Sequence, residues 1–294
     1  MNNFIKRSYR LILLLLSLTI GSYGCSMGQV VVRGSAPIMD GGLVAMNQET
    51  DLELAHSAIP ATIKMMEGML EADPDNIDVR IYVAQAFYGY AFGFVEMQNF
   101  KRAARLYQRG LKHASIALRL SGLDVDIYNT SLEELRSSLD KLDESAIPAL
   151  FWTASCWAKW SDMSRDKPEA IAQITRAAKL MRRVVELNED YYYGGPNLFF
   201  AIYYGARAPM FGGNFELSEQ YFERAKKTTQ GRLLIVDVFY AEYLARQKLD
   251  KQAFHNRLMA VINTPQGYFP EMALANQIAR ERAHKLLQYE EEWF

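Results

Sequence analysis

The chain has 294 residues, of which 50% are hydrophobic, 12% aromatic and 23% charged, with 33 basic against 34 acidic side chains. These proportions exclude a disordered chain and a collagen-like fibre, and a net charge of -1 excludes a strongly basic nucleic-acid-binding protein. Two cysteines, Cys25 and Cys156, are too few for a disulfide framework.

Residues 1–24 have the pattern of a lipoprotein signal peptide. Basic residues precede an apolar run at 11–20, which is too short for the roughly 20 residues of a permanent membrane span. The run leads to Cys25, which resembles the lipidated cysteine of a bacterial lipobox. Because Ser22 and Tyr23 depart from the usual lipobox residues, an ordinary signal peptide with an incidental cysteine is the alternative.

Lipidation at Cys25 predicts where the mature protein resides. Lipid chains would hold it to a bilayer with about 0.8 kcal/mol per buried methylene. The next residue is Ser26 and not Asp, which favours the outer membrane by analogy with enterobacterial sorting. We therefore expect a lipid-anchored periplasmic protein, and Ser26 favours the outer membrane as the site of its anchor.

Two regions follow the signal peptide. Residues 25–45 contain four glycines and Pro37 with little periodicity, which predicts a flexible tether. Residues 46–294 show an almost continuous helical period, as in the stripe Ala103, Tyr107, Gly110. No segment shows convincing strand alternation, and Pro60, Pro148, Pro168 and Pro196 precede apolar runs, where helices start. The expected fold is all-α, a single compact domain.

Weak internal repeats predict how these helices are arranged. Ala253, Ala260 and Pro265 have the spacing of a tetratricopeptide second helix, and Ser218 and Ala225 share that register 35 residues earlier. Stacked helical hairpins with degenerate tetratricopeptide-like repeats are expected. An irregular helical bundle is the alternative.

Aromatic side chains gather in three places along the helical region. Residues 89–96 mix small and aromatic residues and end at Glu96. The position of Glu96 favours a solvated helix end, and a carboxylate that orients a ligand is the alternative. Residues 151–160 hold three tryptophans, and a helix between Gly194-Gly195-Pro196 and 209–213 is apolar on nearly every side. Each set suits either a packed core or the wall of a cavity, and both interpretations stay open.

The polar residues offer no catalytic apparatus. The four histidines are scattered without metal-ligand spacing, and no phosphate-binding loop or nucleophile elbow occurs. Cys156 lies in an apolar helix, which predicts an inert buried thiol. Arg109 is expected to have a structural role, whereas Arg207 suits either helix capping or pairing with a ligand carboxylate. We expect no enzyme, cofactor, metal or nucleic acid.

Beyond these single features, a series of short motifs runs through most of residues 50–290. In chain order they are IP at 59–60, LEADPDN at 70–76, GYAFGFVE at 89–96, LYQRG at 106–110, AIPALFW at 146–152, YYYGGP at 191–196, PMFGGN at 209–214 and FERA at 222–225. With these motifs the sequence resembles the TatT-like T component family of periplasmic TRAP transport systems. One departure is Asn214, where an acidic residue is common.

The resemblance implies a lipid-anchored homotrimer with a channel or cleft through each protomer. It also implies docking of a periplasmic solute-binding protein, the P component, and transfer of a small organic or hydrophobic solute. The alternative function is a membrane-tethered helical-repeat interaction scaffold without ligand transfer. If a channel exists, we expect these residues in its wall: Tyr90, Phe94, Trp152, Tyr193, Phe199, Tyr203 and Arg207.

Overall fold

The computed structural model describes residues 26–294, so the predicted signal peptide and Cys25 lie outside the described residues. Within them the chain forms fourteen α-helices and no strand, which confirms the all-α expectation. The helices are α2 (Met27–Gly34), α3 (Ala36–Asn47), α4 (Leu52–Ala72), α5 (Ile77–Tyr90), α6 (Phe100–Leu120), α7 (Leu132–Leu139), α8 (Ile147–Asp162), α9 (Pro168–Asn188), α10 (Tyr191–Gly205), α11 (Phe215–Thr228), α12 (Ile235–Phe239), α13 (Lys251–Asn263), α14 (Ala273–Leu287) and α15 (Glu290–Trp293).

Short segments of tighter or wider helix join or extend these elements. The π-helical segments η2 (Ala91–Val95) and η5 (Tyr240–Ala245) continue α5 and α12, and 3-10 turns form η3 (Glu144–Ala146), η4 (Pro209–Phe211) and η6 (Pro270–Met272). π segments inside helices often mark functional sites, because they rotate the side chains that follow.

Local sequence explains most of the helix boundaries. The Asn76 side chain accepts a hydrogen bond from the Val79 amide at 3.0 Å, and Asn214 accepts one from Leu217 at 2.9 Å, so both residues cap helix starts. An acidic residue at 214 would cap α11 in the same way. Pro148 and Pro168 open α8 and α9 as expected. Pro60 does not start a helix but lies inside α4.

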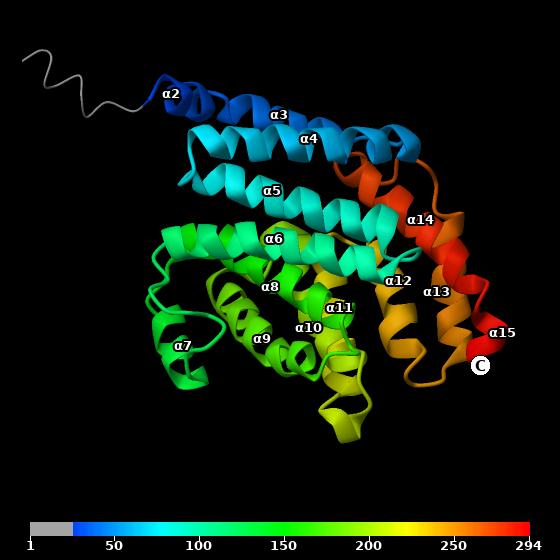
Figure 1. The fold of residues 1–294 in the computed structure, drawn as a ribbon. Coiled ribbons are helices and arrows are strands. Elements are labelled where there is room, and N and C mark those ends of the chain that lie inside the picture. Colours follow the sequence, from blue (N-terminus) through cyan, green and yellow to red (C-terminus); the bar gives the residue numbers. More distant parts are fainter. Residues whose placement is uncertain (1–25) are drawn as a thin grey trace, which may run out of the picture.

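Consecutive helices pack against one another along the chain. The strongest neighbours are α4 with α5, α5 with α6, α6 with α8, α8 with α9, α10 with α11 and α13 with α14. The described chain is therefore one compact stack of helical hairpins, with α4 to α6 above α8 to α11 in Figure 1 and α12 to α15 beside them. Assignment of individual hairpins to tetratricopeptide-like units stays a prediction.

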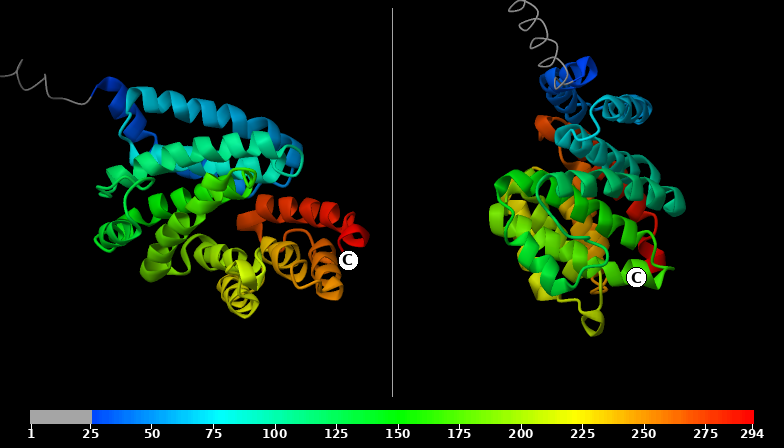
Figure 2. Two further views of the ribbon diagram at one scale, coloured as in Figure 1. Left: turned by 60° about the horizontal axis from the view of Figure 1, so that its bottom comes forward. Right: turned by 60° about the vertical axis from the view of Figure 1, so that its left-hand side comes forward.

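The segment expected to be a tether is helical. α2 starts with a capping box in which Ser26 and Gln29 bond to each other's backbone amides, and Val32 of α2 is buried. The Arg33 guanidinium pairs with Asp73 at 2.9 Å, which fixes α2 beside α4. Both views of Figure 2 place these first helices at one end of the molecule, opposite the green and yellow helices.

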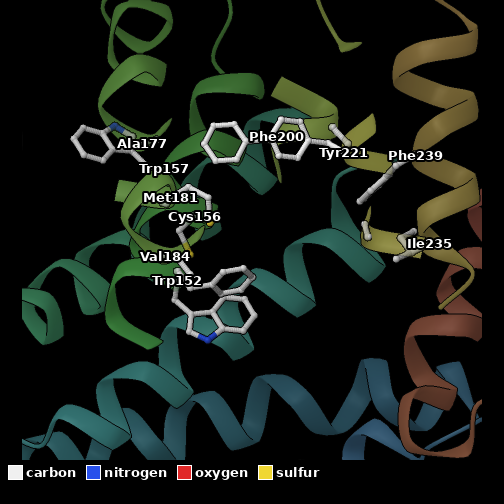
Figure 3. Close-up of a cluster of buried hydrophobic side chains, with 14 of the residues drawn as sticks. Trp152, Cys156, Trp157, Ala177, Met181, Val184, Phe200, Tyr221, Ile235 and Phe239 are labelled. Atoms are coloured by element: carbon white, nitrogen blue, oxygen red, sulfur yellow. The ribbon is translucent and has the colours of Figure 1, made fainter. Parts of the chain in front are cut away.

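The core consists of two clusters of buried apolar side chains. The larger one is built by α6 to α14, their connections and one residue of α5, and the smaller one by α2, α4, α5, η2, α6 and α14. Figure 3 shows part of the larger cluster, with Trp157 beside Ala177 and Phe200 beside Tyr221. Trp157 is fully buried and donates from Nε1 to Gln173 at 2.9 Å. No helix of residues 26–294 is long and apolar enough to cross a bilayer.

Candidate ligand cavity

A cavity of about 770 Å³ lies between the two core clusters. α3, α4, α5, α8, α10 and α14 supply most of its wall, so helices from both ends of the described chain line it. Most of the lining side chains are aromatic, aliphatic or methionine, and only four carry charge, namely Lys159, Asp162, Arg165 and Arg207. A space of this size and character suits a small apolar molecule.

All seven side chains that the sequence predicted for a channel wall line this one cavity. Tyr90 and Phe94 come from the end of α5 and from η2, and Trp152 comes from α8. The other four lie on or just after α10, and they are Tyr193, Phe199, Tyr203 and Arg207. Lining a cavity is the geometric condition for contacting a solute.

A sharp turn at the start of α10 directs aromatic rings into the cavity. Tyr192, Tyr193 and Gly194 all adopt left-handed backbone conformations, with φ of 47°, 60° and 78°. Such values are strained for tyrosine, and strained residues concentrate at functional sites. The Tyr192 ring lies 4.9 Å from the Trp152 ring, and its hydroxyl accepts a hydrogen bond from Gln85 at 3.1 Å. The turn therefore stores strain where it shapes the wall.

Both interpretations of the aromatic helix hold, on different faces of α10. Phe200 is 2% exposed and packs on Tyr221 with ring centres 5.4 Å apart, so this face belongs to the core. Phe199 and Tyr203, one turn apart, are half-buried, stack with ring centres 6.3 Å apart and line the cavity. The three tryptophans on α8 divide likewise: Trp152 lines the cavity, while Trp157 and Trp160 do not.

Glu96 is neither a solvated helix end nor a lining residue of the cavity. It is 1% exposed and pairs with Lys159 at 2.8 Å and with Arg282 at 2.8 Å. Arg282 also binds Glu242 at 2.7 Å, and Tyr107 donates to Glu96. Burial alone would raise the pKa of Glu96, but the two cations outweigh it and hold that pKa below its ordinary value.

The two arginines singled out from the sequence have different surroundings. Arg109 binds Glu67 at 2.7 Å and lies over the Phe87 ring at 4.4 Å, which confirms a structural role. Arg207 donates to the Tyr203 carbonyl at 2.8 Å and lies over the Tyr203 ring at 4.1 Å. Among the described residues no carboxylate pairs with Arg207, so it is the cavity-lining cation without an acidic partner.

Sequence reasoning missed the side of the cavity built by α3, α4 and α14. These lining residues share flexible or branched aliphatic side chains, and examples are Ile38, Met39, Leu43, Met46, Met65, Met66, Leu274 and Ile278. Five methionines between positions 39 and 69 were the available signal, because methionine is enriched at adaptable binding surfaces. The glycines of residues 25–45 concealed it by suggesting a tether.

The structure gives neither Cys156 nor the acidic and histidine residues of the described chain a catalytic or metal-binding arrangement. Cys156 is fully buried, burial raises the pKa of its thiol, and its sulfur lies 3.9 Å from the Ala84 carbonyl. In residues 26–294 no three acidic, histidine or cysteine side chains are grouped as a metal site would need.

The fold and the cavity together define, within residues 26–294, an all-helical protein whose helices line an apolar, ligand-sized cavity. The family model for the TRAP transporter T-component (TAtT) matches residues 48–294, and the chain belongs to this family. Its role is therefore that of an accessory component in TRAP transport, on the periplasmic side. A comparison with curated proteins gives no match.

Proposed function

We propose that this T component binds a small organic solute in the cavity and docks the solute-binding P component of a TRAP system. The cavity carries the proposal, because it is about 770 Å³ in volume, largely apolar and bordered by a few polar groups. Such a site holds the apolar body of a solute by burial, while the polar groups orient it.

The scaffold alternative is less well supported. A helical-repeat scaffold needs only a concave outer surface over a continuous packed core. Here aromatic residues that would gain free energy by packing, such as Phe199 and Tyr203, stay half-buried around an open space. Their exposure to the cavity lowers the stability of the solute-free protein, and a bound solute would cover these rings.

We further propose that lipid on Cys25 anchors the protein to the outer membrane and that three protomers assemble. The described chain starts at Ser26, and α2 follows directly at one end of the molecule (Figure 1). An anchor at this point would leave α8 to α11, at the opposite end, projecting into the periplasm for a partner. The anchor, the trimer and the docking are parts of the proposal that separate experiments must test.

The test is co-purification from detergent-solubilised membranes of a strain that makes the full-length protein, followed by native mass spectrometry. The expected result is a trimer carrying diacylglyceryl-modified Cys25, a bound P component and a retained small molecule. A Cys25→Ala variant is the matched control, because it should lose membrane attachment and keep the solute.

Two outcomes would contradict the proposal. Recovery of the protein without any retained small molecule, together with failure of apolar dyes to bind it, would remove the solute-binding role. A stable monomer that never associates with a solute-binding protein would favour the scaffold alternative.

A further inference from the structure

Three of the four charged residues that line the cavity lie at the end of α8. Four cavity-lining residues come from the last turn of this helix or from just beyond it, and a fifth comes from η5. We refer to these five residues as the polar end, and they are Lys159, Ser161, Asp162, Arg165 and Tyr243. Trp152 and Ser155, earlier on α8, line the aromatic part of the same cavity.

The charges of the polar end are already compensated within the protein. Lys159 is 12% exposed and pairs with Glu96, which is itself held by Arg282. Arg165 donates from Nε to Asp162 at 2.9 Å. A carboxylate that entered here would find both cations already paired, and beside the buried Lys159–Glu96 pair a further charge without a partner is costly.

The two hydroxyls, in contrast, have no partners. Ser161 is 3% exposed, and its Oγ is buried without a hydrogen bond among the described residues. Such orphaned groups are rare in folded proteins and call for a ligand or water. The Tyr243 hydroxyl makes no hydrogen bond to a described residue either. Burial raises the pKa of Tyr243 well above its ordinary value, so this hydroxyl stays a proton donor.

Ser161 and Tyr243 line the same cavity. Tyr243 also interacts electrostatically with Asp162, the residue next to Ser161, and with Arg165. η5 therefore presents its tyrosine to the end of α8. A hydroxyl both donates and accepts a hydrogen bond, so two unpartnered hydroxyls match a ligand group that can do the same.

We propose that the polar end binds the uncharged oxygen-bearing head, an alcohol, of a solute whose hydrocarbon body occupies the aromatic part of the cavity. This inference rests on the proposed solute-binding function and narrows its ligand to an uncharged amphiphile. Ser161 Oγ and Tyr243 Oη hold the head, while Lys159 and Arg165, already paired with Glu96 and Asp162, offer no free cation to a charged head.

Competition binding with matched probes tests the proposal. The purified protein is first loaded with the uncharged apolar dye N-phenyl-1-naphthylamine, which is then displaced by 1-decanol or by decanoate at pH 7.5. The two competitors share a chain and differ in head charge. We expect 1-decanol to bind more tightly, and Ser161→Ala and Tyr243→Phe each to weaken its binding about 3- to 10-fold, the equivalent of one hydrogen bond.

Matched variants keep the test specific. Ser137→Ala removes an exposed hydroxyl on α7, outside the cavity wall, and should leave decanol binding unchanged. Dye affinity should be the same in all three variants, because the dye does not need the hydroxyls. Ser161→Ala removes an unbonded group and Tyr243→Phe keeps the ring, so both variants should fold, which circular dichroism checks.

Three results would overturn the inference in distinguishable ways. Equal decanol affinity in wild type, Ser161→Ala and Tyr243→Phe would show that the head lies elsewhere. Tighter binding of decanoate that Arg207→Gln abolishes would place an anionic head at Arg207. Failure of the dye and of both competitors to bind would overturn the proposed solute-binding function along with this inference.

Discussion

At the scale of single residues, Phe200 and Tyr203 show how one helix serves two purposes. Phe200 is 2% exposed in the core, while Tyr203 is half-buried and faces the cavity. Removal of a buried aromatic ring leaves a void and costs about 3–5 kcal/mol. Removal of a ring that already borders an open space creates less new void.

We therefore predict that Tyr203→Ala weakens binding of N-phenyl-1-naphthylamine and lowers the free energy of unfolding by only about 1–2 kcal/mol. Phe200→Ala is the matched control and should cost about 3–5 kcal/mol. Urea unfolding gives the free energies, and dye fluorescence gives the affinity. Equal destabilisation by the two substitutions would assign Tyr203 to the core.

Glu96 supports a second prediction, about charge. Its carboxylate neutralises the buried Lys159 and Arg282, so Glu96→Gln should lower the free energy of unfolding by about 3–5 kcal/mol at pH 7. Because the folded pKa lies below the ordinary value of 4.5, the unfolded state binds the proton more readily. This contribution is present above about pH 4.5 and is lost as the pH falls through the folded pKa.

The measurement is urea unfolding of wild type and Glu96→Gln between pH 7 and pH 3.5. The gap between their stabilities should shrink toward acid. The exposed Glu71→Gln is the control and should change stability by less than about 0.5 kcal/mol at every pH. A gap that stays constant with pH would show that the pKa of Glu96 is the same in the folded and unfolded states, and a gap that widens toward acid would show a folded pKa above the ordinary value.

The residue scale also shows where sequence reasoning succeeds and where it stops. The residue types of a solute cavity were recognisable, since Tyr203 and Trp152 fall in apolar helices with turn motifs beside them. The partition of Trp152 and Trp157 between cavity and core was not, because it depends on helix rotation. The environment of Glu96 depends on Lys159 and Arg282, which are remote in sequence, and no local pattern indicates them.

At the scale of elements, α3 is the part of the cavity wall that is held most weakly. None of its residues is buried, although Ile38, Met39 and Leu43 line the cavity. A hydrogen bond from the Tyr82 hydroxyl to Asp40 connects it to α5. Few buried contacts predict low local stability, so α3 is the element best suited to open the cavity.

The prediction is that Asp40→Ala raises amide hydrogen exchange in residues 36–47 about 3- to 10-fold, because one hydrogen bond is lost. Exchange in α9 should not change. Glu71→Ala on α4 serves as the matched surface control. Unchanged exchange in residues 36–47 would show that apolar contacts alone hold α3 over the cavity.

Two glycines, Gly213 after α10 and Gly68 in α4, support predictions of opposite sign for the free energy of unfolding. A Cβ at Gly213 would lie 1.8 Å from the Arg207 carbonyl oxygen, which is backbone and cannot move aside cheaply. Gly213→Ala should therefore lower the free energy of unfolding by about 3 kcal/mol or displace Arg207 from the cavity wall. Gly68→Ala in α4, where a Cβ meets nothing within 4 Å, should instead raise it by about 0.5–1 kcal/mol. Thermal unfolding distinguishes the two.

The element scale explains the missed tether as well. Residues 27–47 are rich in glycine and carry little periodicity, so their helices are stabilised by their surroundings and not by propensity. Arg33 with Asp73 and Tyr82 with Asp40 supply those contacts, and each partner is about 40 positions away. A single sequence does not reveal such pairs, although the helical hairpins from α4 onward follow from local periodicity.

At the scale of the whole molecule, the cavity joins the two core clusters. Its wall runs from α3 near the start of the described chain to α14 near its end, so a bound solute contacts both clusters at once. A ligand that binds only the folded state raises stability by an amount fixed by its concentration and affinity. Unfolding of the entire protein should therefore report on occupancy of this one space.

We predict that N-phenyl-1-naphthylamine at 100 times its dissociation constant stabilises the folded protein by about 2.7 kcal/mol, which raises the thermal midpoint by about 5–10 °C in a chain of this size. Differential scanning calorimetry measures the midpoint. Ala275→Trp is the matched variant, because residue 275 lines the cavity and an indole there fills part of its volume. The dye should shift its midpoint far less. An equal shift in both proteins would show that the dye binds outside the cavity. The thermal midpoint would then not report on occupancy of the cavity.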